Sequence, residues 1–76
     1  MGYIVAIFRS RSESLKLAGY LSDAGVWNKV ISTPKEANVG CGLSVKIFEN
    51  SVSITKAAIN YLRLKGFVGF LKVQRY

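Results

Sequence analysis

The stretch YIVAIF, residues 3–8, decides the fold because it is apolar at every position and rich in β-branched and aromatic residues. A run of this kind predicts a strand in the centre of a sheet. A second stretch, LSVKIFE at residues 43–49, alternates Leu43, Val45 and Ile47 with polar residues. This alternation predicts another strand.

A helical pattern of apolar residues follows each of these two strands. The first helix is expected to begin with a capping box in the motif SRSE, residues 10–13, and to end at Gly25. The second is expected to begin at Asn50 or Ser51 and to end at Gly66. The expected apolar positions are Leu15, Leu17, Ala18, Leu21 and Ala24 in the first helix, and Ile54, Ala57, Ala58, Tyr61 and Leu62 in the second.

Residues 26–32 and 67–73 complete the pattern as two further strands, each of which follows a helix. The order strand-helix-strand therefore occurs twice, and right-handed crossovers place the first and third strands in the middle of the sheet. We predict one α+β domain over residues 1–76 with the ferredoxin-like βαββαβ arrangement. In this arrangement, two helices cover one face of a four-stranded antiparallel sheet.

This topology brings separate segments to one end of the sheet. The connection from Thr33 to Gly42 is expected at the same end as the start of the first helix and the turn before the fourth strand. The residues expected on this rim, beside Cys41, are Arg9, Ser10, Arg11, Ser12 and Lys65. The helix start adds free backbone N–H groups and a positive dipole end, so the rim would favour a thiolate or an anion bound to sulfur.

The composition excludes several classes of function. The chain has 76 residues, no His and a single Cys. It therefore lacks the residues for His-based acid–base catalysis, Cys-His nucleophile pairs, disulfide scaffolds and most zinc sites. Its four acidic residues form no close pair in the sequence. We expect no metal site and no enzyme with its own turnover.

Charge and size indicate the kind of partner and compartment. The net charge of +7 favours attraction to anions. The longest apolar run is too short to cross a membrane, and a lone Cys fits a reducing compartment, so we expect a cytoplasmic protein with no membrane partner. A chain of this size has one modest core, and a homodimer would add stability.

Cys41 is the residue with the most chemistry. It lies between two glycines at the end of a long connection, and such connections often carry function. The candidate site is Cys41 as the reactive thiol, with Arg9, Ser10, Arg11, Thr33, Pro34, Lys35, Gly40 and Gly42 as binding or tuning neighbours. Two structural alternatives stay open. Cys41 would be a small, half-buried apolar residue at the start of the third strand, and residues 33–36 would be a helical turn capped by Thr33.

The stretch KGFVGFL, residues 65–71, resembles the RNP1 sequence of RNA-binding RRM domains. RNP1 belongs on the third strand, whereas this stretch spans the end of a helix and the fourth strand. Phe67 and Phe70 are also expected on opposite faces of that strand. We interpret the stretch as aromatic packing and do not expect nucleic acid as a partner. Nucleic-acid binding through the basic surface stays a weaker alternative.

Several motifs together resemble a known family. The first strand ends in Phe8-x-Ser10, the first helix ends in Ala-Gly-Val at residues 24–26, TPKE follows at residues 33–36, and Cys-Gly-Leu opens the third strand at residues 41–43. From Tyr3 to about Val73 the chain resembles the selenium/sulfur (Se/S) carrier-like family of small bacterial and archaeal proteins. The family's spacer before the Cys is usually serine-rich, and here it is ANVG.

The resemblance implies that Cys41 holds sulfur or selenium as a persulfide or selenosulfide. The protein would pass this atom from a donor protein to an acceptor protein and need no other cofactor. The alternative is a small binding or regulatory module in which Cys41 is incidental and the open face of the sheet binds the partner. The aromatic residues expected on that open face are Trp27, Phe8, Phe48 and Phe70.

Overall fold

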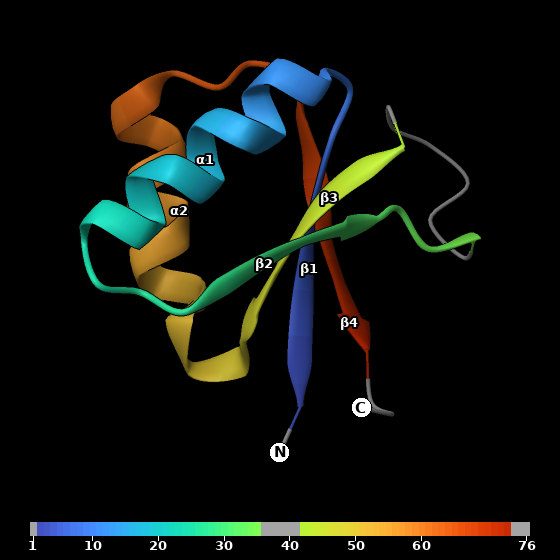
Figure 1. The fold of residues 1–76 in the computed structure, drawn as a ribbon, viewed down its shortest axis with the longest axis horizontal. Coiled ribbons are helices and arrows are strands. Elements are labelled where there is room, and N and C mark those ends of the chain that lie inside the picture. Colours follow the sequence, from blue (N-terminus) through green and yellow to red (C-terminus); the bar gives the residue numbers. More distant parts are fainter. Residues whose placement is uncertain (1, 36–41, 74–76) are drawn as a thin grey trace.

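The structure, a computed structural model, describes residues 2–35 and 42–73 (Figure 1). Its elements are β1 (Tyr3–Phe8), α1 (Arg11–Asp23), β2 (Asn28–Ser32), β3 (Leu43–Phe48), the short 3-10 helix η2 (Glu49–Ser51), α2 (Val52–Leu62) and β4 (Phe67–Val73). The predicted bounds of the first and fourth strands are confirmed. The second strand begins later than predicted, and the third ends one residue earlier because the chain turns into η2. Within the described ranges, no helix is long and apolar enough to cross a membrane.

The four strands form one antiparallel sheet in the order β2-β3-β1-β4 (Figure 1). The first and third strands occupy the two central positions, as predicted. Across them, Tyr3 lies opposite Phe48 and Ile4 lies opposite Ile47. An α+β fold with two helices and a four-stranded antiparallel sheet is thus confirmed.

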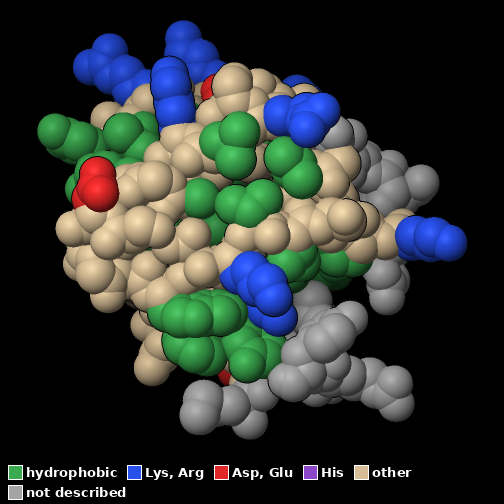
Figure 2. Space-filling model, viewed as in Figure 1, with side chains coloured by type: hydrophobic (Ala, Val, Ile, Leu, Met, Phe, Trp, Pro, Cys, Tyr) green, Lys and Arg blue, Asp and Glu red, His purple; other side chains and the backbone are tan. Residues whose placement is uncertain are grey.

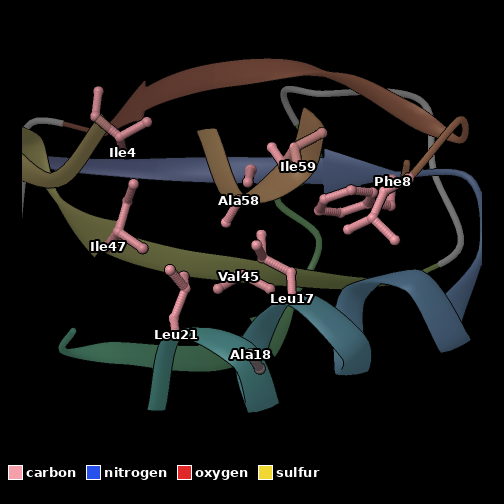
Figure 3. Packing of buried hydrophobic residues seen from close by; sticks show 11 residues of the cluster. Ile4, Phe8, Leu17, Ala18, Leu21, Val45, Ile47, Ala58 and Ile59 are labelled. Atoms are coloured by element: carbon pink, nitrogen blue, oxygen red, sulfur yellow. The ribbon is translucent and has the colours of Figure 1, made fainter. Parts of the chain in front are cut away.

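The hydrophobic core lies between one face of the sheet and the two helices (Figure 3). Every second side chain of β1 and of β3 points toward the helices, as a pleated strand requires. The strands contribute Ile4, Ala6, Phe8, Val45 and Ile47, and the helices contribute Leu17, Ala18, Leu21, Ala58 and Ile59. The expectation that Phe8 and Phe70 lie on the open face is wrong. Phe8 is fully buried in the core, and Phe70, the partner of Ala6, packs against it.

A β-bulge changes the faces of β4. Gly69 lies opposite Ile7 but Phe67 lies opposite Phe8, so the register shifts at this point. Phe67 and Phe70 consequently both pack against the core, with their ring centroids 5.0 Å apart. The prediction that they lie on opposite faces is wrong because a bulge interrupts the two-residue period of a strand.

The helices bury stripes that differ from those predicted. In α1 the buried residues are Ser14, Leu17, Ala18 and Leu21, while Leu15 is exposed. In α2 they are Thr55, Ala58 and Ile59, while Ile54 and Tyr61 are exposed. The α2 sequence carries two adjacent apolar stripes, and packing against the sheet selects the one that contains Ile59 and the smaller Thr55.

The two helices end in the same backbone motif with different residues. After α1, Gly25 has φ +77° and donates to Ser22 O, and Val26 donates to Leu21 O, which is the hydrogen-bond pattern of a Schellman motif. After α2 the matching bonds run from Arg63 to Asn60 O and from the next residue to Ile59 O. Arg63, with φ 56°, therefore takes the left-handed position. The prediction that Gly66 ends this helix is wrong.

We predict that Arg63→Gly stabilises the protein. Among the described residues, Arg63 is the only non-glycine residue with a positive φ, a conformation that a Cβ atom disfavours. The variant should raise the free energy of unfolding by about 0.5–1 kcal/mol, measured by urea denaturation. Lys56→Gly, at an exposed position inside α2, is the matched control and should lower it by about 1 kcal/mol. A destabilised Arg63→Gly protein would contradict this account of the helix end.

Candidate functional site

Three segments that are distant in sequence meet at one end of the sheet. The Ser14 hydroxyl of α1 donates to Leu43 O at the start of β3, at 2.9 Å. The Arg9 N–H donates to Gly66 O, also at 2.9 Å. The start of α1, the start of β3 and the turn before β4 are therefore joined by hydrogen bonds at the end of the sheet where the rim is expected.

Glu13 joins two of these segments and does not close a capping box. Its carboxylate accepts a hydrogen bond from the Gly66 N–H at 2.9 Å. Ser10 is the N-cap residue of α1, as predicted, but its side chain makes no capping bond and its hydroxyl lies 2.8 Å from that of Ser12. The capping-box prediction is wrong because a tertiary partner, the turn before β4, takes up the Glu13 side chain.

Ser14 is a buried polar residue that the sequence interpretation missed. It is fully buried, and its position in the spacing Ser14, Leu17, Ala18, Leu21 puts it on the core-facing stripe of α1. A serine on an otherwise apolar stripe is the signal that could have identified it, since a buried hydroxyl requires a partner. Its bond to Leu43 O fixes the start of β3, two residues after Cys41, against the second turn of α1.

The described ends of the connection between β2 and β3 are held together. The Thr33 N–H donates to Gly42 O at 2.9 Å, and the Thr33 hydroxyl lies 2.7 Å from the Ser44 hydroxyl. Ser44 is fully buried, so its hydroxyl bond with Thr33 anchors the base of the loop. Gly42 has φ +99°, a conformation that a residue with a side chain rarely adopts. The glycine after Cys41 therefore has a backbone role.

The predicted site residues divide into described and undescribed groups. Gly40 and Cys41 lie outside the described residues, as does Glu36 of the TPKE motif. Thr33 and Pro34 are half-buried at the base of the loop, and Lys35 and Gly42 are exposed. On the neighbouring segments Arg9, Arg11, Ser12 and Lys65 are exposed, and Ser10 is half-buried.

Among the described residues, the end of the sheet that these hydrogen bonds join carries more positive than negative charge. Arg9 and Arg11 flank Ser10 at the start of α1, and Lys65 precedes Gly66, which is hydrogen-bonded to Arg9. The free N–H groups of α1 add the positive end of the helix dipole. Glu13 is the acidic residue in the first turn of α1, and it is engaged with Gly66. This environment suits an anionic group.

In the described part of the chain, no group of three or more His, Cys, Asp or Glu residues could hold a metal ion.

Comparison with known protein families gives a match that covers residues 3–66. The matched family is described as "Putative Se/S carrier protein-like". The chain belongs to this family. The match spans β1 through α2 and continues to the turn before β4, so it includes the whole connection between β2 and β3. No curated protein and no solved structure matches the chain.

We predict that Ser14→Ala destabilises the protein. The change leaves the Leu43 carbonyl without its side-chain donor and should lower the free energy of unfolding by about 1–2 kcal/mol, measured by urea denaturation. Ser12→Ala is the control. Ser12 is exposed on the same helix, and its loss should change stability by less than about 0.5 kcal/mol. Equal effects of the two variants would contradict the anchoring role of Ser14.

A second buried hydroxyl should respond in the opposite direction. Thr55 is fully buried, and its Oγ1 has no hydrogen-bond partner. Thr55→Val replaces this hydroxyl with a methyl group of similar shape, so it should raise the free energy of unfolding by about 1 kcal/mol. The same denaturation measurement checks this prediction, and a loss of stability would show that the Thr55 hydroxyl has a partner in solution.

Proposed function

We propose that this protein carries sulfur or selenium on Cys41, as a persulfide or a selenosulfide. The observation that carries the proposal is the family match over residues 3–66, which includes Cys41 and its flanking segments. The described neighbours support it. The loop that contains Cys41 has a base fixed by Thr33, Gly42 and Ser44, next to the positively charged start of α1.

The chemistry of such a carrier is an exchange that needs no external oxidant. The Cys41 thiolate attacks the terminal sulfur of a persulfide on a donor protein. A new S–S bond forms, the donor's S–S bond breaks, and the donor cysteine leaves as a thiolate. An acceptor thiolate later attacks the outer sulfur on Cys41 in the same way, which regenerates the Cys41 thiolate. A chain with one Cys suits this role because it has no second thiol to convert the persulfide into an internal disulfide.

We infer a carrier rather than an enzyme. The chain has no His to serve as a general base, and Glu13, the acid in the first turn of α1, is engaged with Gly66. The partners would be the donor and acceptor proteins, and the basic rim would dock them. The element order and the order of strands support a ferredoxin-like βαββαβ classification, and we place the carrier in the reducing cytoplasm.

Intact mass spectrometry tests the cargo directly. Protein purified without reductant should contain a population heavier by one sulfur or one selenium atom, and a reductant should remove the added mass. Cys41→Ser should never show it, because no other thiol is present. Wild-type protein that stays at its unmodified mass after incubation with a persulfide donor would overturn the proposal.

The pH dependence of alkylation tests the activation of the thiol. If the positive rim favours the thiolate, the rate of alkylation by iodoacetamide should rise with pH along a titration curve. The midpoint of this curve should lie below about 8.5, the usual pKa of free Cys. Arg11→Gln should raise this pKa, because removing a nearby positive charge makes the thiolate less stable.

Lys16→Gln, which makes the same charge change farther along α1, is the matched control and should leave the pKa of Cys41 unchanged. A midpoint at or above about 8.5, or equal shifts in the two variants, would contradict activation by the rim.

A further inference from the structure

Three aromatic rings form a cluster at the end of β1 opposite to the rim. The three ring centroids form a triangle: the Phe48 ring stacks on Trp27 at 4.5 Å with an interplanar angle of 28°, and on Tyr3 at 5.5 Å with an angle of 25°. The centroids of Tyr3 and Trp27 are 5.9 Å apart. Trp27 is the most exposed, at 42 %, and the other two rings are half-buried.

This cluster lies on the face of the sheet that the helices leave open. Tyr3 and Phe48 are cross-strand partners on the two central strands, and each is adjacent in sequence to a residue that points into the core. Because neighbouring side chains of a strand alternate between faces, both rings point away from the helices. Figure 2 shows a hydrophobic patch on the surface near the start of β1, with a Lys or Arg side chain beside it.

The same face carries positive charge next to the rings. Lys46 Nζ lies 4.5 Å from the centroid of the Tyr3 ring. Lys29 is exposed and is the cross-strand partner of Lys46, so the two lysines share this face. Glu49, which follows Phe48 in the sequence, is paired with Lys72, with 2.9 Å between Glu49 Oε2 and Lys72 Nζ. Lys72 lies opposite Ile4, a core residue, so its side chain belongs to the other face.

We propose that the aromatic cluster binds single-stranded nucleic acid, through base stacking on its rings and phosphate contacts with the exposed Lys29. Aromatic side chains on the central strands of a four-stranded sheet are one of the general solutions for holding unpaired bases. The net charge of +7 adds a favourable long-range field for a polyanion.

This inference is separate from the carrier role, because it uses neither Cys41 nor the rim. It also differs from the RNP1 resemblance of residues 65–71, since Phe67 and Phe70 pack against the core. The rings involved come from positions 3, 27 and 48, and only the strand register brings them together.

The sole tryptophan of the chain makes the test direct. Single-stranded oligonucleotides of about ten residues should quench Trp27 fluorescence in a saturable manner. A duplex of the same sequence, in which the bases are paired, should bind more weakly. Poly-glutamate at equal charge carries no bases and should bind more weakly too. Affinity for the oligonucleotide should fall as salt rises.

Matched variants separate stacking from charge, with anisotropy of a labelled oligonucleotide as the readout. Trp27→Leu should weaken binding by at least about fivefold. Tyr61→Leu removes an aromatic that is 74 % exposed on α2 and should leave the affinity unchanged. Lys29→Glu should weaken binding more than Lys56→Glu, an exposed position on α2 where the change of net charge is the same. Circular dichroism confirms that each variant is folded.

The alternatives give distinct outcomes. Equal affinities for Trp27→Leu and Tyr61→Leu would reduce the interaction to bulk charge and overturn the proposal. Tighter binding of poly-glutamate than of the oligonucleotide would identify an acidic protein segment as the occupant. A stable dimer in light scattering that Trp27→Leu disrupts would identify a second copy. Absence of binding to any single-stranded oligonucleotide at low salt would also overturn the proposal.

Discussion

The burial of β1 on both faces is the constraint on which the rest of the structure depends. Its even-numbered residues face the helices, and Val5 and Ile7 on the other side are also buried, at 0 % and 4 % exposure. The observed register places Ile4 and Ala6 with Val45 and Ile47 on the helix side, and a shift of β1 by one residue would put Tyr3, Val5 and Ile7 there instead. That register positions β3 and β4 on either side of it.

Once β1 and β3 are in register, the two ends of the sheet acquire different chemistry. At one end, the Ser14 hydroxyl donates to Leu43 O, and the Thr33 and Ser44 hydroxyls are hydrogen-bonded to each other. These bonds connect the polar base of the loop to the start of α1. At the other end, the same register sets Tyr3 against Phe48. Trp27, at the entrance to β2, then completes the aromatic cluster. Both surfaces therefore result from one strand pairing.

The sequence predicts the features that depend on local pattern and chain topology. The bounds of β1 and β4, the central position of the first and third strands, and Ser10 as the N-cap all follow from residue type and spacing. The features it misses depend on tertiary contacts. Glu13 binds the Gly66 N–H instead of closing a capping box, a bulge rotates Phe67 toward the core, and α2 buries Ile59 rather than Tyr61. Near the candidate site, the glycine at position 42 indicates an unusual backbone conformation, and its φ is +99°. The role of Ser14 appears only when Leu43 lies beside α1.

The two proposed surfaces are far enough apart to be altered independently. Leu43 and Phe48 are the first and last residues of β3, and five residue steps of a strand span roughly 17 Å. Substitutions separated by more than about 10 Å with no shared partner have effects that add. Trp27→Leu should therefore leave the chemistry of the thiol intact, and Arg11→Gln should leave base stacking intact. Coupling between the two would require a ligand long enough to reach from the loop end of β3 to the aromatic cluster.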